Sequence, residues 1–319
     1  MSKTAVVILN WNGKELLKEF LPSVITHTTD ADIWIIDNAS TDNSVDFLKN
    51  NFPSIKHIQL DKNYGFAGGY NKGLQSIDAE NYVLLNSDVE VTKNWLPPLI
   101  NHLNKHPQTA VVQPKIKDYK NKKKFEYAGA AGGFLDFFGY PYCDGRILFK
   151  TDEDKGQYEQ EKEIFWASGA CFVIRKDIFE QFNGFDDTYF AHQEEIDLCW
   201  RIKNKGYKIK YIPSSTVFHL GGASLNKQSS FKTYLNFRNN LLTLLKNLPT
   251  IYIFPVIVTR LLLDGLAGMV FFLKGKPRHT LAVIKAHFGF YKKIPSTWRK
   301  RSKKQISKYY NRFSIFLNY

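Results

Sequence analysis

The chain has 319 residues, of which 44% are hydrophobic and 23% are charged, a composition typical of a folded globular protein. It contains no glycine- and serine-rich linker, internal repeat or low-complexity tract, which excludes disordered and fibrous classes. Its net charge of +14 is concentrated in residues 251–319, which carry 14 lysines and arginines and one acidic residue, Asp264. This basic C-terminal region predicts contact with an anionic surface, namely membrane headgroups, nucleic acid or an acidic partner.

Residues 4–115 alternate between short apolar runs and amphipathic segments. We expect strands at residues 5–9, 33–36, 55–60, 82–85 and 110–113, and helices at about 14–26, 42–51, 68–78 and 93–105. This alternation predicts βαβ units with right-handed connections, and therefore an α/β fold with a mostly parallel sheet. Residues 116–165 are rich in lysine, glycine and aromatic residues, and we expect them to form loops or a small antiparallel excursion that covers a site.

The second half of the chain returns to patterned sequence. We expect strands at residues 165–175 and 207–212 and helices at 176–182, 194–205 and 232–247. Residues 251–273 are apolar and long enough to span a bilayer, but Arg260 and Asp264 interrupt them. A charge at the bilayer centre costs roughly 2.5–3.5 kcal/mol. We therefore expect these helices to pack on the domain or to lie in the membrane interface.

The cysteines and the N-terminus indicate the compartment. The three cysteines, Cys143, Cys171 and Cys199, show no metal-type spacing, which favours buried thiols in a reduced, cytosolic environment. The N-terminal residues lack the basic start and long apolar stretch of a signal peptide, so we expect none.

Polar residues follow the first two expected strands. Asn10 and Asn12 follow the first strand, and Asp37 ends the second. Ligands of open α/β sheets bind at this edge, so these side chains could hold a base or a ribose. An ordinary strand-to-helix turn would explain them as well. The sequence has neither GxGxxG nor GxxxxGK[ST], so a classical dinucleotide fold and a P-loop are not supported.

Two further segments point to a phosphate-bearing ligand. Residues 63–73, NYGFAGGYNKG, place Asn63, Gly68, Gly69 and Asn71 at a helix start, where glycine permits close backbone approach and the helix N-terminus favours anions. Residues 86–88, Asn-Ser-Asp, follow a buried strand. Asp88 is a hard oxygen donor suited to Mg²⁺ or Mn²⁺ carrying a diphosphate. Alone, such a tripeptide is more often a turn.

Carboxylates and a histidine in the second half complete the candidate site. Glu194, Glu195 and Asp197 stand at a helix start, where acidic residues also favour the macrodipole. Helical spacing puts Glu194 and Asp197 on one face, with Glu195 pointing elsewhere. His219 lies before two glycines after an expected strand and could bind metal or phosphate, although a lone histidine is usually structural.

Taken in order, these segments resemble the family 2 glycosyltransferases with the GT-A fold, in the subgroup that includes bacterial rhamnosyltransferases. The resemblance covers roughly residues 4–245 and rests on five spaced motifs. It implies a metal site at Asp88 and His219 and an acceptor site at Ser168, Gly169, Ala170 and Asp197. It also implies contacts to a nucleotide sugar from Asn10, Asn12, Asp37, Asn63, Gly68, Gly69, Asn71, Asn86 and Ser87.

The implied catalytic pair, Glu194 and Glu195, departs from the family, which usually has aspartate at the second position. Misplacing a reacting group by about 1 Å can cost about 10²-fold in rate. We expect Glu195 to act as the general base, with Glu194 as the first alternative. A catalytically weak sugar-nucleotide binder is a competing interpretation.

The resemblance implies an inverting displacement assisted by Mg²⁺ or Mn²⁺, from a dTDP- or UDP-linked sugar, rhamnose first, to a glycan or lipid-linked acceptor. We expect a GT-A domain at residues 1–245 and a helical basic extension at 246–319 that makes peripheral contact with the inner face of the cell membrane. Nucleic-acid binding through the basic region is a weaker alternative, because residues 1–250 are nearly neutral and contain no recognised nucleic-acid motif. A nucleotidyltransferase would need a basic phosphate-binding loop near the first strand, which the sequence lacks.

Overall fold

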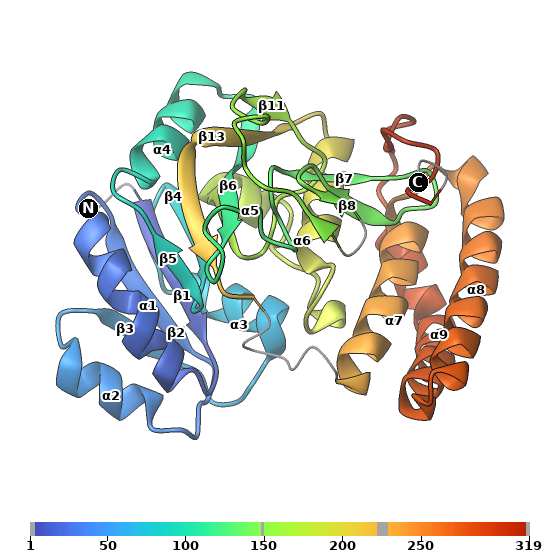
Figure 1. Cartoon of the computed structure of the whole chain (residues 1–319), viewed down its shortest axis with the longest axis horizontal. Helices are drawn as coiled ribbons and strands as arrows, with labels where there is room; N and C mark the ends of the chain where they lie inside the picture. The colour runs from blue at the N-terminus through green and yellow to red at the C-terminus, as the bar shows by residue number, and fades with distance from the viewer. Residues whose placement is uncertain (1–3, 148–149, 222–228, 317–319) are drawn as a thin grey trace.

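The computed structural model describes residues 4–147, 150–221 and 229–316. These residues form a mixed α/β sheet domain with a layer of helices beside it (Figure 1). The nine-stranded central sheet has the order β11-β13-β6-β12-β4-β1-β2-β3, with β5 paired to β13. Its strands are β1 (Thr4–Asn10), β2 (Asp32–Asp37), β3 (Lys56–Gln59), β4 (Asn81–Asn86), β5 (Val89–Val91), β6 (Thr109–Asp118), β11 (Lys162–Glu163), β12 (Cys171–Arg175) and β13 (Lys208–His219).

The parallel register of β1 with β2 and β4 brings three strand ends to one edge of the sheet. Asn10 pairs in register with Asp37, and Leu9 with Asn86. The strands are buried on both faces, which is why their sequences are nearly continuous apolar runs. The predicted parallel core and its polar edge are confirmed.

Helices cover both faces of the sheet. One face packs against α1 (Lys14–His27), α2 (Ser44–Asn51) and α4 (Leu96–Lys105), which share one apolar core with it. The other packs against α3 (Gly65–Leu74), α5 (Lys176–Gln181) and α6 (Glu194–Asn204), which belong to a second core. A short 3₁₀ helix, Asp187–Tyr189, precedes α6.

Two strand predictions differ from the structure. The strand expected at residues 165–175 begins only at Cys171, and it runs antiparallel between β4 and β6. The strand expected to end at residue 212 continues to His219. β13 contains Pro213, which cannot donate to the ladder, and the strand absorbs it in a register shift between Ile212 and Thr216. This continuation carries His219 to the neighbourhood of Asp88.

The lysine- and glycine-rich segment forms a small antiparallel sheet that projects toward the C-terminal helices (Figure 1). Its strands are β7 (Gly133–Leu135), β8 (Pro141–Cys143), β9 (Arg146–Ile147) and β10 (Lys150–Thr151). The expected excursion from the main sheet is therefore present, with more regular structure than its composition indicated.

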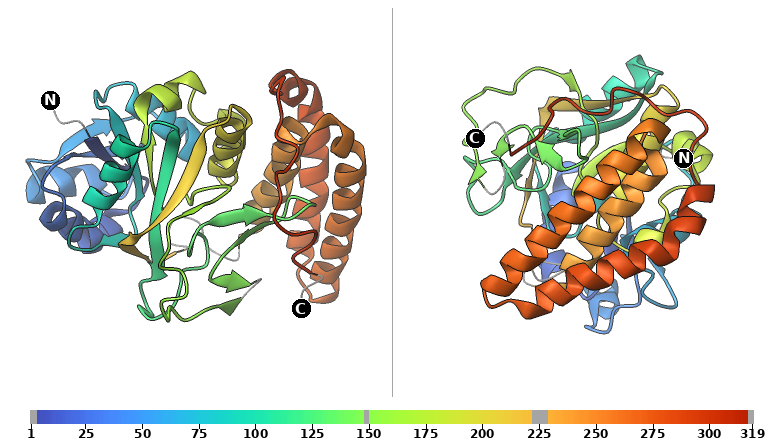
Figure 2. Two further views of the ribbon diagram at one scale, coloured as in Figure 1. Left: turned by 90° about the horizontal axis from the view of Figure 1, so that it is seen from above. Right: turned by 90° about the vertical axis from the view of Figure 1, so that its right-hand side faces the viewer.

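Three C-terminal helices form a layer at the far side of the molecule from β3 (Figure 2). They are α7 (Ser230–Asn247), α8 (Thr250–Leu273) and α9 (Pro277–Arg299). α7 packs against α6 as well as against α8 and α9. The boundary expected after residue 245 falls inside this continuous helix. The chain then returns to the sheet domain, where the buried ring of Tyr309 stacks on Trp200.

Candidate active site

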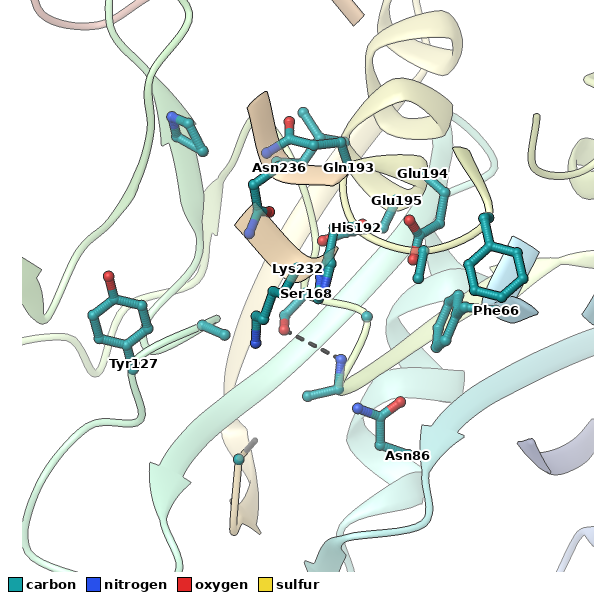
Figure 3. Close-up of a pocket in the computed structure, with 18 of the residues that line it drawn as sticks. Phe66, Asn86, Tyr127, Ser168, His192, Gln193, Glu194, Glu195, Lys232 and Asn236 are labelled. Atoms are coloured by element: carbon teal, nitrogen blue, oxygen red, sulfur yellow. Dashed lines mark hydrogen bonds between the residues drawn. The ribbon is translucent and has the colours of Figure 1, made fainter. Parts of the chain in front are cut away.

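A cleft of about 1290 Å³ opens at the polar edge of the sheet and extends to the C-terminal helices. Its floor contains the ends of β1 and β4, and its walls include the loop before α6 and the turn before β12. Figure 3 shows Glu194 and Glu195 on the same side of the cleft as Phe66, with His192 near Ser168 and Lys232. The cleft contains these site residues predicted from the sequence: Asn12, Asn63, Asn86, Ser87, Asp88, Ser168, Gly169, Ala170, Glu194, Glu195 and His219.

Asp88 and His219 meet at the cleft floor. β13 runs antiparallel to β5, with His219 in register with Val89, and this pairing puts His219 Nε2 3.1 Å from Asp88 Oδ1. The other ring nitrogen, Nδ1, lies 3.4 Å from a Glu126 carboxylate oxygen. Burial opposes the imidazolium charge, but the two carboxylates prevail and raise the pKa of His219 to about 10. Burial also acts against the Asp88 carboxylate, yet His219 lowers its pKa overall.

This donor set fits a divalent cation once the imidazolium of His219 gives up its proton, since a ligating histidine must be neutral. A carboxylate oxygen and a neutral imidazole nitrogen can then be neighbouring ligands, and their 3.1 Å separation suits two groups that face one ion. Glu126 at the second ring nitrogen corresponds to the carboxylate that commonly orients a metal-bound histidine. Among the described residues, no set of three or more histidine, cysteine or acidic side chains is placed to hold a metal. The protein would therefore supply two ligands, which leaves positions for a diphosphate.

Glu194 and Glu195 begin α6 at the cleft wall. Among described residues, neither Glu194 Oε2 nor Glu195 Oε2 has a hydrogen-bond partner. Burial, together with the neighbouring Glu195 charge, raises the pKa of Glu194 well above its ordinary value. Burial raises the pKa of Glu195 to about 7, although hydrogen bonds from backbone N–H groups oppose the rise. Perturbed acids in a cleft are typical of catalytic groups.

The loop before α6 is held in an unfavourable backbone conformation. Phe190, His192 and Gln193 have φ angles of 65°, 69° and 76°, a backbone region that residues other than glycine rarely adopt. The Asn239 amide on α7 donates to three carbonyls of this loop, those of Tyr189, Ala191 and His192, at 3.0, 2.9 and 2.8 Å. Strained backbone of this kind persists where its surroundings fix it, and it clusters at active sites. A helix of the C-terminal layer therefore positions the loop before α6.

His192 belongs to this strained loop and was not predicted as a site residue. It lines the cleft, as Lys232 does (Figure 3). Burial, with the Lys232 charge, lowers the pKa of His192 to about 4, so the ring is neutral at physiological pH. Its Nε2 has no hydrogen-bond partner among the described residues. A neutral imidazole with a spare nitrogen can donate to or accept from a sugar hydroxyl.

The residues expected to contact the nucleotide divide into two groups. Asn12 and Asn63 line the cleft. Asn10 and Asp37 are fully buried beneath it, where Asn10 donates to Asp37 at 2.9 Å and the Ser40 N–H donates to Asp37 at 2.9 Å. In this structure they fix the turn that carries Asn12 and do not line the cleft, so their contact with the nucleotide stays a prediction.

The glycine-rich segment has a packing role. A Cβ at Gly69 would lie 2.8 Å from a Leu9 side-chain carbon, and one at Gly68 would lie 3.0 Å from the Tyr64 Cβ. Asn71 donates to the Phe185 carbonyl at 2.8 Å and accepts from the Phe185 N–H at 2.9 Å. These three residues close α3 onto the sheet and onto the segment before α6, and they lie outside the cleft lining. Their contact with the nucleotide likewise stays a prediction.

The turn before β12 places Ser168, Gly169 and Ala170 in the cleft wall. The Asn86 N–H donates to the Ala170 carbonyl at 2.9 Å, which joins this turn to the end of β4. A Cβ at Gly169 would lie 3.5 Å from Phe66 and 4.0 Å from the Glu195 carboxyl carbon. Glycine here keeps the space in front of the acid open.

Asp197 does not face the cleft, and its predicted acceptor contact is corrected. Its carboxylate is fully buried and pairs with Arg201 at 2.8 Å and with Lys246 at 2.9 Å, and it accepts from Asn247 at 2.8 Å. Burial disfavours the charge, but the two cations lower the pKa overall. Helical spacing suggested that Asp197 shares a face with Glu194, but cations on α6 and α7 draw its side chain into the interior.

Several residues that form the cleft were not predicted from the sequence. They lie in the irregular segment or on the C-terminal helices and include Glu126, Tyr127, Arg146, Lys232, Asn236, Asn240 and Arg260. Two adjacent asparagines on the otherwise amphipathic α7, Asn239 and Asn240, are both buried. Consecutive amides at core positions of a helix are the one signal that could have revealed this wall.

The fold is that of the GT-A class, as comparison with solved structures shows. A structure of GalNAc-T7 with UDP, GalNAc and Mn²⁺ aligns with a TM-score of 0.59 and 19% identity over 78% of this chain and 49% of that one. A mannosyltransferase from Pyrobaculum calidifontis in complex with GDP-Man and Mn²⁺ aligns with a TM-score of 0.56 and 12% identity, over 91% of this chain and 87% of that one.

The protein belongs to glycosyl transferase family 2, whose sequence pattern it matches over residues 5–182. A Mycobacterium tuberculosis protein named N-acetylglucosaminyl-diphospho-decaprenol L-rhamnosyltransferase is 24% identical over 231 residues, which cover 67% of this chain and 75% of that protein. The sequence-based predictions of the family and of the GT-A fold are confirmed.

Proposed function

We propose that the enzyme transfers a sugar, with inversion at the anomeric carbon, from a dTDP- or UDP-linked donor to a hydroxyl of a glycan or lipid-linked acceptor in cell-surface polysaccharide synthesis. L-rhamnose is the sugar we propose first, because the mycobacterial relative is named a rhamnosyltransferase that acts on a lipid diphosphate sugar. The cleft is large enough for both substrates, since ligand pockets commonly measure about 300–1,000 Å³ and this one exceeds that range.

The observation that carries the mechanism is the acid pair at the start of α6. A general base works best when its pKa lies near the operating pH, and burial raises the pKa of Glu195 to about 7. Burial and the nearby Glu195 charge also raise the pKa of Glu194 well above its ordinary value. We assign the base role to Glu195, with Glu194 as the first alternative.

In the proposed reaction the acceptor hydroxyl attacks the anomeric carbon while the bond from that carbon to the diphosphate oxygen breaks. Glu195 takes the hydroxyl proton during the attack, an assistance that typically contributes about 10²–10⁴-fold. Gly169 leaves the space before this carboxyl open, and His192 offers its neutral ring to a sugar hydroxyl. The turn at residues 168–170 holds the acceptor against the base.

Asp88 and His219 would hold Mg²⁺ or Mn²⁺ beside the donor diphosphate. When bound, such an ion neutralises negative charge that develops on the leaving nucleoside diphosphate. Asn86 takes the place of a first carboxylate, so the protein contributes little negative charge of its own to the ion. The phosphates of the donor then supply the remaining ligands, and metal affinity depends on the donor.

We also propose that the basic C-terminal region brings the enzyme to the inner face of the cell membrane, where a lipid-linked acceptor is available. Basic residues near anionic lipid contribute about 1 kcal/mol each. Residues 251–319 carry 14 of them against one acidic residue.

A thermal-shift panel of nucleotide sugars with Mg²⁺ or Mn²⁺ tests the donor assignment. Ligand binding raises apparent stability by RT ln(1 + [L]/Kd), so the true donor should raise Tm only when metal is present. Asp88→Asn should abolish this metal-dependent shift. The exposed Asp61→Asn is a matched control and should keep it. If no donor shifts Tm, or if the shift is the same without metal, the proposal fails.

A further inference from the structure

Helix α8 exposes its apolar side chains and buries its charged ones. Arg260 and Asp264 are only 3% and 2% exposed, whereas Phe254 and Leu262 are 78% and 68% exposed. Surface helices of soluble proteins have the opposite pattern, with the apolar face toward the core. The exposed apolar residues repeat at three- and four-residue intervals, so they share one face from end to end: Ile251, Phe254, Val258, Leu262, Leu266, Met269 and Leu273.

Helix α9 continues this surface. It packs along α8 and α7 through buried residues such as Val283 and Ala286. Its own exposed apolar residues follow the same spacing and are Leu281, Ile284, Phe288, Tyr291 and Trp298. α8 and α9 pack on each other in the helical layer seen in Figure 2, and the two exposed sets together are here named the α8–α9 face. Soluble monomers rarely expose contiguous apolar patches larger than a few hundred Å².

The charges around this face are all positive. Lys274, Lys276 and Arg278 are exposed at the turn between the helices. Further exposed cations lie along α9, at Lys285, Lys292 and Arg299. Asp264, the acidic residue of this region, is buried against Arg260 and His287.

We infer that the α8–α9 face inserts into the headgroup and upper acyl region of an anionic lipid bilayer, with both helices lying in the plane of the membrane. A large apolar face rimmed by lysine and arginine is the pattern of interfacial helices. A second copy of this chain fits the face poorly, because its own cationic rim would repel the identical rim. This inference specifies the surface behind the proposed membrane contact, and it requires neither donor binding nor sugar transfer.

The neighbours of α8 argue for an in-plane rather than a spanning arrangement. α8 is long and apolar enough to cross a membrane by length and composition. However, α9 packs alongside α8 and exposes Lys285, Lys292 and Arg299 along its length. A spanning α8 would draw these charges into hydrocarbon, where each is costly. At the interface, lysine and arginine instead extend their charged ends to the headgroups.

The opposite face of α8 links the membrane surface to the cleft. Arg260, Leu263, Asp264 and Ala267 line the cleft where it reaches α8. Arg260 stacks on Tyr140 at 3.7 Å and donates to the Phe138 carbonyl at 3.0 Å, which anchors α8 to the β7–β8 hairpin. One helix thus faces the bilayer on one side and the active-site cleft on the other. Insertion places that end of the cleft at the membrane surface, where a lipid-linked acceptor can enter.

Vesicle sedimentation of the full chain tests the face. The protein should sediment with vesicles of phosphatidylcholine and phosphatidylglycerol and much less with phosphatidylcholine alone. Leu262→Ser should weaken binding by about tenfold, because it removes a large apolar side chain from the inserted surface. Ile25→Ser, at an exposed isoleucine on α1, is the matched control and should leave binding unchanged. Lys274→Gln with Lys276→Gln should weaken binding to the anionic vesicles only.

The depth of insertion distinguishes the arrangements. The native cysteines, Cys143, Cys171 and Cys199, are buried, so a fluorophore can be directed to Phe254→Cys, Leu262→Cys or Met269→Cys. An in-plane helix predicts similar quenching at all three positions by a shallow lipid-borne quencher. Maximal depth at Leu262→Cys with shallower ends would indicate a spanning helix and overturn the inference. Self-association that Leu262→Ser abolishes, without vesicle binding, would assign the face to a second copy and also overturn it.

Discussion

The sheet domain and the C-terminal helical layer place their apolar and charged residues in opposite ways. In the sheet domain, the side chains of Val6, Val7 and Phe172 are at most 1% exposed. In α8, by contrast, the buried residues include Arg260 and Asp264, and the exposed ones are large and apolar. A single aqueous solvent cannot account for both patterns. The sheet domain has the pattern of a protein that folds in water, and the helical layer is the part that we propose meets lipid.

Paired phenylalanine substitutions give the most direct test of this comparison. Phe172→Ala, on β12, should lower the free energy of unfolding by about 3–5 kcal/mol because it leaves a cavity in the core. Phe254→Ala, on α8, should change it by less than about 0.5 kcal/mol, because that side chain is exposed in water. Urea denaturation without lipid measures both. Equal losses for the two variants would contradict the contrast.

The second prediction concerns the junction between the two regions. Lys246 on α7 pairs with Asp186 at 2.8 Å and with Asp197 at 2.9 Å. Lys246→Met should destabilise the protein by about 3–5 kcal/mol, since removing one partner leaves buried carboxylates less compensated. The exposed Lys205→Met is the control and should have little effect. A small loss in the free energy of unfolding for Lys246→Met would mean that these two ion pairs do not hold the helical layer on the sheet domain.

The third prediction addresses the acids that the helical layer helps to position. Glu195→Gln should lower kcat by about 10²–10⁴-fold, because the amide cannot take the proton from the hydroxyl of the acceptor substrate. Donor binding, measured by thermal shift, should remain. The exposed Glu180→Gln should retain full activity. If Glu194→Gln removes activity and Glu195→Gln does not, the base role belongs to Glu194.

The smallest expected effect is the pH dependence of the same group. The pKa of Glu195 is raised by burial to about 7 in the folded protein, whereas an ordinary glutamate has a pKa near 4.3. The folded state therefore holds its proton more tightly, so stability should fall as pH rises from about 4.3 to 7 and level off above that. Activity should rise over the upper part of this range, because the base must be ionised.

Glu195→Gln provides the control for this pH profile. The variant should remove this group's contribution to the stability profile, measured as Tm against pH. An unchanged profile would show that Glu195 titrates normally in the folded chain.

Much of the sheet domain could be predicted from local sequence. Asn10, Asp37, Asn86 and Asp88 each end an apolar run, and parallel strands carry their ends to one edge. What local sequence could not provide was the direction of buried polar side chains. Asp197 and Asn71 are residue types that active sites commonly use. Here, however, a cation holds Asp197 in the interior and backbone groups hold Asn71, and both come from distant segments.

The sequence by itself determined the α/β class, the order of the motifs, the acid pair and the separation of charge between the two parts of the chain. Only the tertiary structure decided which polar residues reach the cleft, that Glu126 lies behind His219, and that Asn239 holds the strained loop before α6. It also decided that α8 turns its apolar face outward. Strand and helix patterns depend on neighbours in the chain, whereas burial of a polar group depends on which distant partner satisfies it.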